Sequence, residues 1–218
     1  MRILYIADEK RVRMGAHQFN NLLVRALRRA GHTVDTLYPP EGVPLFSENL
    51  KGINTILWFH SLLRGREDVR RYDVIQGTTF TTLAFLDSGV PVISHFGSTV
   101  HGFLESVPSM RGLDRERVAL TQIYRELREN GVIERLNPPL KSLKDVSGVE
   151  MEVAKKSDLV VASSRGVRQE LIGRGVPADN ILVVHNAIEN SWFRSRIVRT
   201  AKPRAELVYL GRLGEDAF

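Results

Sequence analysis

Short apolar runs alternate with amphipathic segments from the first residues onward. Residues 2–7 read RILYIA, which is typical of a strand buried on both faces of a sheet. Apolar residues then recur at helical spacing between Phe19 and Ala30, and Gly31 follows where the C-terminal cap of a helix belongs. The run HTVDTLY at residues 32–38 predicts a second strand. A strand, a helix and a strand in this order form the βαβ unit of a parallel sheet.

The alternation continues along most of the chain. Helices are expected at residues 79–87, 114–129 and 164–173, and Ser163 and Ser164 are candidate N-caps for the last of these. The charged stretch 102–148 interrupts the pattern. Together these segments predict an α/β fold with a Rossmann-like, doubly wound, mostly parallel sheet. Its further strands are expected at residues 53–59, 73–77, 90–94, 158–162, 181–184 and 207–210.

The length bears on the domain organisation. A chain of 218 residues has room for one large domain, or for one domain and a fragment of another. The last expected strand, at residues 207–210, is followed by no helical segment. We therefore expect residues 1–204 to form one domain and residues 205–218 to begin a second domain or to form a tail.

The composition restricts the possible chemistry. The chain has 31 basic and 25 acidic side chains, and 24 of the basic ones are Arg, whose planar fork suits phosphate. This excess fits either a solvated surface or an anionic partner. Cysteine is absent, which excludes a disulfide scaffold, a thiol nucleophile and a zinc site built on thiolates.

The apolar runs are too short to cross a bilayer, and the start does not resemble a signal peptide because charged residues follow at 8–11. We expect a cytoplasmic protein. Peripheral contact with the inner face of an anionic membrane stays open, because the helix at residues 15–30 and the stretch 111–135 are rich in Arg.

Five segments occur in a characteristic order. They are RILYIAD with Gly15 before the helix that ends RALRRAGHTV; YDVIQG; GVPVISHFGSTVHG; EMEVAKKSDLVVASS; and ILVVHNAIENSWF followed by LVYLGRL. In this order they resemble the N-terminal, acceptor-side half of the family 4 retaining glycosyltransferases. The resemblance covers almost the whole chain. It implies one half of a GT-B architecture, in which two Rossmann-like domains face one another across a cleft.

The resemblance also implies an activity. Such a protein transfers a sugar from a nucleotide-diphosphate sugar to a hydroxyl of an acceptor, either a glycan or a lipid-linked molecule, with retention of configuration. The family needs neither a bound metal nor another cofactor. Because most of the donor site lies in the C-terminal domain, we expect this chain to be inactive on its own. The sugar, the base and the acceptor do not follow from the sequence.

Two positions are candidates for binding the donor diphosphate. Gly15 precedes a helix, where backbone N–H groups can approach phosphate, although a lone glycine there also fits ordinary turn chemistry. In the family, an Arg and a Lys of a G-R-L-x-x-x-K segment neutralise the diphosphate. Here Gly211, Arg212 and Leu213 match that segment, and Ala217 stands at the position of the Lys.

The loop after the GVPVIS strand carries, in the family, a histidine beside the transferred sugar. Phe96 stands at the position of that histidine, so His95 and His101 are the two candidate catalytic residues. The family's Pro-Asn-Gly-Ile segment matches residues 185–188 here, with Ala187 in place of the glycine. Candidate contacts to the acceptor or the sugar are Gly97, Ser98, Thr99 and Asn186.

Other readings of the sequence compete with this one. A non-catalytic Rossmann-like module that binds a sugar or a nucleotide is the main alternative, and Ala187 and Ala217 favour it. A nicotinamide-dependent oxidoreductase is disfavoured because the first turn lacks a GxGxxG fingerprint. Nucleic-acid binding is disfavoured because the aromatic residues do not alternate with the basic ones. Glu126 and Glu134 have the spacing of the family's paired glutamates, but they precede the Gly-Arg-Leu segment and are interpreted as surface charges.

Overall fold

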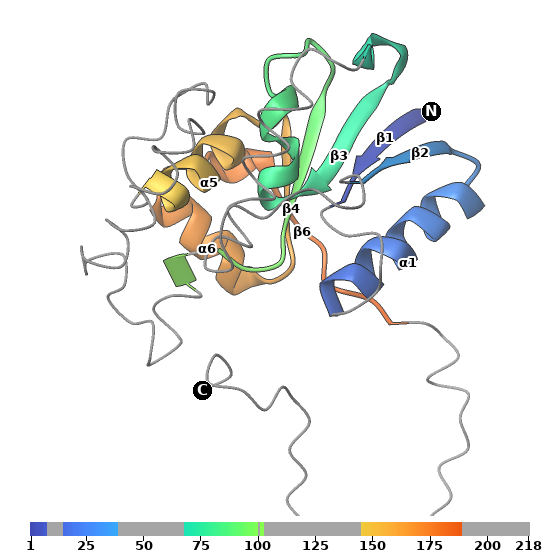
Figure 1. Ribbon diagram of the computed structural model, residues 1–218. Coiled ribbons are helices and arrows are strands. Elements are labelled where there is room, and N and C mark those ends of the chain that lie inside the picture. Colours follow the sequence, from blue (N-terminus) through green and yellow to red (C-terminus); the bar gives the residue numbers. More distant parts are fainter. Residues whose placement is uncertain (8–14, 39–67, 100, 103–144, 189–218) are drawn as a thin grey trace, which may run out of the picture.

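The strands form one parallel sheet in the computed structural model, which describes residues 1–7, 15–38, 68–99, 101–102 and 145–188 (Figure 1). The strand order is β2-β1-β3-β4-β5-β6, and all five neighbouring pairs are parallel. This confirms the predicted Rossmann-like α/β fold. The strands are β1 (Arg2–Ile6), β2 (Thr33–Leu37), β3 (Val74–Thr78), β4 (Val92–Phe96), β5 (Leu159–Ala162) and β6 (Ile181–Val183).

Helices connect these strands. The α-helices are α1 (Gly15–Arg29), α5 (Asp145–Lys156) and α6 (Arg165–Gly173), and the 3-10 helices are η3 (Val69–Arg71), η4 (Thr79–Phe85) and η6 (Ala178–Asn180). The helix expected at residues 79–87 is therefore a 3-10 helix, and the sequence pattern missed α5. The elements expected at residues 53–59, 114–129 and 207–210, and the boundary at residue 204, lie outside the described residues.

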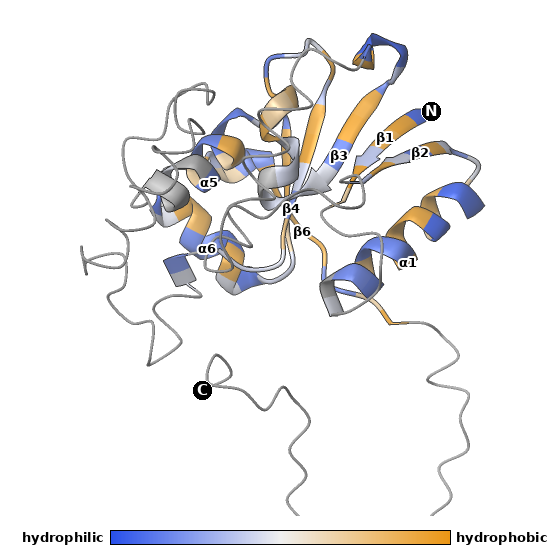
Figure 2. Cartoon of the chain, viewed as in Figure 1, coloured by the Kyte–Doolittle hydropathy of each residue, from blue (hydrophilic) through white to orange (hydrophobic). Residues whose placement is uncertain are grey.

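Strand β1 is buried on both faces, as its apolar run predicts. Ile3 and Tyr5 pack with Val24 of α1 on one face, while Leu4 and Ile6 pack with Phe85 of η4 on the other. Figure 2 shows the matching apolar stripe on α1, with polar residues on its outer side. Gly31 ends this helix with a φ of +86°, a conformation that glycine adopts without strain.

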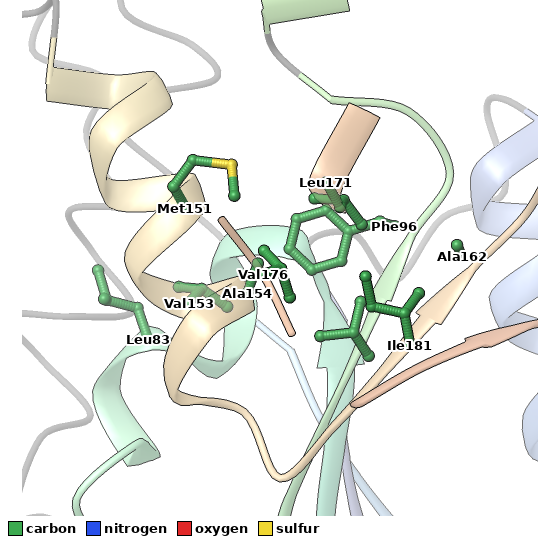
Figure 3. Close-up of a cluster of buried hydrophobic side chains, with 10 residues drawn as sticks. Leu83, Phe96, Met151, Val153, Ala154, Ala162, Leu171, Val176 and Ile181 are labelled. Carbon is green, nitrogen blue, oxygen red and sulfur yellow. The ribbon is translucent and has the colours of Figure 1, made fainter. Parts of the chain in front are cut away.

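The far half of the sheet is covered by α5 and α6. Their side chains pack on Phe96, Val160 and Ile181 of the sheet in the cluster drawn in Figure 3. The helices contribute Met151, Val153, Ala154 and Leu171 to that cluster. Ser164 caps the first turn of α6, since its hydroxyl accepts a hydrogen bond of 3.2 Å from the amide of Val167.

Three buried hydroxyls connect η4, β4 and α5 beneath the sheet. Ser94 lies between the other two, with its Oγ 2.7 Å from the hydroxyl of Thr82 and 2.7 Å from that of Ser157. Ser157 in turn donates to the carbonyl of Val153 at 2.7 Å. Each of these polar groups is therefore satisfied inside the core, as burial requires.

Among the described residues, no helix combines the length and the apolar character that crossing a membrane would need.

The order of the strands has a consequence for ligands. Strand β2 pairs with one side of β1, and the chain then crosses back to form β3 on the other side. Open α/β sheets bind ligands at such a switch point, beyond the carboxyl ends of the strands.

Replacing Ile75 by Ala should lower the free energy of unfolding by about 3 kcal/mol, because Ile75 is fully buried in the middle of the sheet and its truncation leaves a cavity. Urea denaturation measures this change. Ile188→Ala is the matched control, since Ile188 is 57% exposed and its truncation should cost less than about 0.5 kcal/mol. Equal losses from the two substitutions would contradict the placement of β3 in the core.

Candidate functional site at the carboxyl edge of the sheet

Most of the sequence-predicted site residues gather at one edge of the sheet. Because every strand pair is parallel, the carboxyl ends of β4 and β6 lie at the same edge as the start of α1. Gly15 opens α1, His95 lies near the end of β4, and Asn186 follows β6. A β-carbon at Gly15 would meet no atom within 4 Å, so the space beside this end of the helix is open.

His95 occupies the centre of this edge. Its side chain is 4% exposed and its ring stacks on Phe19 of α1, with 4.7 Å between the ring centroids and 20° between the planes. The neighbouring Phe96 points the opposite way, into the cluster beneath α5. The alternation of side chains along β4 therefore puts His95, and not Phe96, on the face covered by α1.

One ring nitrogen of His95 has no partner. Nε2 is buried and has no hydrogen-bond partner among the residues that the structure describes, whereas buried polar atoms in proteins are nearly always paired. Burial lowers the pKa of His95 below its usual value of 6.5, because the charged imidazolium loses its hydration. The imidazole is thus neutral at pH 7, so one of its ring nitrogens can donate a hydrogen bond and the other can accept one.

The turn after β4 carries four more of the predicted residues. Gly97 and Ser98 are exposed, whereas Thr99 is 1% exposed. The Thr99 hydroxyl donates to a carboxylate oxygen of Glu170 and accepts from the amide of Gly102 at 2.9 Å. His101, in the helical turn that follows, is half-buried. A role for Thr99 in sugar binding stays a prediction, since its hydroxyl already has two protein partners.

The ends of β5 and β6 continue the same edge. The Ser163 hydroxyl donates to the carbonyl of Gly97 at 2.7 Å, and Nδ1 of His185 lies 3.0 Å from the carbonyl of Ser163. Asn186 and Ala187 are exposed beyond them. Arg212, the second candidate for the diphosphate, lies outside the described residues.

A hydroxyl joins β1 and β3 at the switch point. Thr81 of η4 accepts from the amide of Thr78 at 2.9 Å and donates to the carbonyl of Ile6 at 3.2 Å. A β-carbon at Gly77 would lie only 2.2 Å from the Thr81 oxygen, so no larger residue fits there. Thr79 has a φ of 42°, which is rare for a residue other than glycine and often marks functional sites.

Sequence reasoning did not single out Phe19, Thr79 or Glu170. Phe19 was interpreted as an ordinary core position of its helix. Glu170 belongs to the edge only through a contact across 71 residues of sequence, for which no local pattern exists. Within the ranges that the structure describes, no three His, Cys, Asp or Glu side chains are grouped so that they could hold a metal ion.

Comparison with known proteins identifies the family. The family model described as Glycosyltransferase Family 4 matches residues 15–192. The chain therefore belongs to Glycosyltransferase Family 4, as the sequence resemblance implied. No curated protein sequence matches the chain.

Solved structures share the fold at low identity. The glycotransferase of kitacinnamycin is 13% identical, with a TM-score of 0.51, over 94% of this chain and 55% of its own. HepE from Anabaena, crystallised with UDP, is 14% identical, with a TM-score of 0.42, over 90% of this chain and 47% of its own. A UDP-glucosyltransferase from Polygonum tinctorium is 12% identical, with a TM-score of 0.41, over 92% and 55%. The chain spans about half the length of these proteins.

The lowered pKa of His95 predicts a pH dependence of stability. As the pH falls below 6.5, the unfolded chain takes up a proton on this residue before the folded chain does, so the free energy of unfolding should decrease. The loss should continue until the pH reaches the pKa of His95 in the folded protein. His95→Phe keeps a ring against Phe19 but cannot titrate, and it should remove this component from urea denaturation curves recorded between pH 7.5 and 5. An unchanged pH profile in that variant would contradict the prediction.

Proposed function

We propose that the chain is the N-terminal, acceptor-side domain of a retaining glycosyltransferase that moves a sugar from a nucleotide-diphosphate sugar to an acceptor hydroxyl. Membership of Glycosyltransferase Family 4 supports the transferase class. The site is proposed from one observation: the buried Nε2 of His95 has no partner within the described part of the chain, and it lies at the edge where open α/β sheets bind ligands.

The chemistry asked of this domain is positioning. In the transfer, the bond from the anomeric carbon to the diphosphate oxygen breaks, a bond to the acceptor oxygen forms, and the proton of the acceptor hydroxyl leaves with the departing nucleoside diphosphate. A neutral His95 gives a hydrogen bond to a hydroxyl of the sugar or the acceptor without adding charge to the site. The stacking on Phe19 holds the imidazole in one orientation before the substrate arrives.

The donor diphosphate is proposed to face the start of α1. The unpaired N–H groups of a helix N-terminus attract phosphate, and the space beside Gly15 is open. Arg212 is proposed to supply the positive charge that stabilises the departing diphosphate. The solved structures matched are about twice as long as this chain, which supports a second lobe that completes the donor site.

The acceptor is proposed to approach over the exposed turn at Gly97 and Ser98, and near Asn186. A lipid-linked acceptor would bring α1 near an anionic surface, since Arg25 and Arg29 are exposed on it. The guanidinium of Arg28, on the same helix, donates to the carbonyl of Val34 at 2.7 Å. Flotation with liposomes, with and without anionic lipid, measures this contact, and binding that ignores anionic lipid would remove it from the proposal.

His95→Phe should lower the rate of sugar transfer about tenfold to a hundredfold, because it preserves the stacking on Phe19 and removes only the hydrogen bond from Nε2. The assay follows release of the nucleoside diphosphate from uridine and guanosine diphosphate sugars by the full-length protein. Residues 1–218 alone serve as the negative control, since the second lobe is proposed to be essential.

The matched control for this variant is His32→Phe, because His32 lies between α1 and β2 at the opposite edge of the sheet. It should transfer sugar at the rate of the unmodified protein. Equal activity of His95→Phe and His32→Phe would refute the role of His95. Robust turnover by residues 1–218 alone would refute the need for a second lobe, and binding of nucleotide sugars without turnover by the full-length protein would favour a non-catalytic binding module.

A further inference from the structure

We propose that Glu170 is a positioning residue that holds the turn from Gly97 to Gly102 in place, and so sets where Ser98 and His101 lie relative to His95. This inference rests on the proposed function, because it assigns a purpose to the turn that carries the candidate sugar contacts. Glu170 itself touches no substrate in this account. It acts through the hydroxyl of Thr99.

The direction of the hydrogen bonds explains why a carboxylate stands at position 170. A carboxylate only accepts hydrogen bonds, so the Thr99 proton must point toward Glu170. The lone pairs of the Thr99 oxygen are then left for the amide of Gly102, which donates to it at 2.9 Å. Thr99 thereby caps the helical turn at residues 101–102 in one fixed sense. A charged acceptor also strengthens this bond over a neutral one.

The glycine at position 102 makes room for the carboxylate. A β-carbon there would lie 2.7 Å from Oε2 of Glu170 and 3.0 Å from Oγ1 of Thr99. The first distance is shorter than real contacts and the second is tight, so a side chain at position 102 would shift the carboxylate at the end of the Glu170 side chain away from its place beside Thr99. Thr99, Gly102 and Glu170 therefore form one set, in which the glycine leaves the space that the carboxylate occupies.

Contacts with well-packed parts of the fold hold the turn at both of its ends. Glu170 precedes Leu171, which is fully buried in the cluster that fixes α6 on the sheet. At the other end, the Ser163 hydroxyl donates to the carbonyl of Gly97 at 2.7 Å. Figure 1 shows the short helical piece that follows β4 beside α6. Ser98 is thus an exposed residue on a turn held from two sides, as a preorganised site requires.

The first test measures amide hydrogen exchange of Gly102 by NMR. Glu170→Ala and Thr99→Val should each raise its exchange rate at least tenfold, while the amide of Ile75, which donates to the carbonyl of Pro91 in the sheet, should keep its rate. Thr99→Ser retains the hydroxyl and should restore the slow exchange. Glu152→Ala is the matched control, because it removes a glutamate whose partner is Lys156 on α5. Unchanged exchange at Gly102 in Glu170→Ala would overturn the proposal.

The second test is a double-mutant cycle. Gly102→Ala should slow sugar transfer and raise the exchange rate of the amide at position 102, as Glu170→Ala does, because it displaces the same carboxylate. The double variant should then exchange the amide at position 102 no faster than Glu170→Ala alone. Effects that add in full would show that position 102 acts independently of Glu170, and would overturn the set.

The third test separates positioning from folding in the full-length protein. With every variant assayed at a temperature at which it is fully folded, Glu170→Ala should lower kcat/KM for the nucleotide sugar or the acceptor about tenfold, and Glu152→Ala should leave it unchanged. Faster exchange with unchanged kcat/KM would overturn the positioning role. If the unmodified protein transfers no sugar from any uridine or guanosine diphosphate donor, the proposed function fails, and the exchange of Gly102 still decides whether Glu170 holds the turn.

Discussion

Parallel pairing of β1 with β2 on one side and β3 on the other is the constraint on which the rest of the molecule depends. It places β2 and β3 on opposite sides of β1, and it gathers all the carboxyl ends at one edge. Residues separated by more than a hundred positions, such as Gly15 and Ser163, are brought to the same edge without any local signal. The apolar run of β1, buried on both faces, is what stabilises this arrangement.

The elements with strong periodicity could be predicted from the sequence, whereas those decided by tertiary contacts could not. The apolar residues of α1 and the glycine after it mark that helix without help from the rest of the chain. Helix α5 lacks so clear a pattern, because Val153 and Ala154 are neighbours and Glu150, at its centre, is fully buried. Segment 79–85 reads as a helix, but the bridging hydroxyl of Thr81 and the left-handed Thr79 favour a tighter 3-10 turn there.

In the candidate site, too, some residues could be predicted from the sequence and others depend on tertiary contacts. His95 could be named from the sequence because its strand and the turn after it have a familiar pattern. The properties that single out His95 could not be predicted from the sequence. They are the burial of Nε2, the stacking on Phe19 and the lowered pKa, and they depend on the packing of β4 within the fold, including its contact with α1. The carboxylate of Glu170 is a still clearer case, since only the packing of α6 brings it to Thr99.

The chain of hydroxyls beneath β4 has a consequence of its own. Each hydroxyl carries one proton, and Ser157 directs its proton to the carbonyl of Val153. Ser94 then points its proton to Ser157, and Thr82 points its proton to Ser94 at 2.7 Å, with the carbonyl of Thr79 at 3.4 Å as a second acceptor within reach. The three hydroxyl protons therefore all point in one direction, from η4 through β4 to the end of α5. A valine at position 94 would remove the 2.7 Å acceptor of Thr82 and the donor to Ser157, and would leave Thr82 only the carbonyl of Thr79 at 3.4 Å, so this midpoint favours a small residue with a hydroxyl.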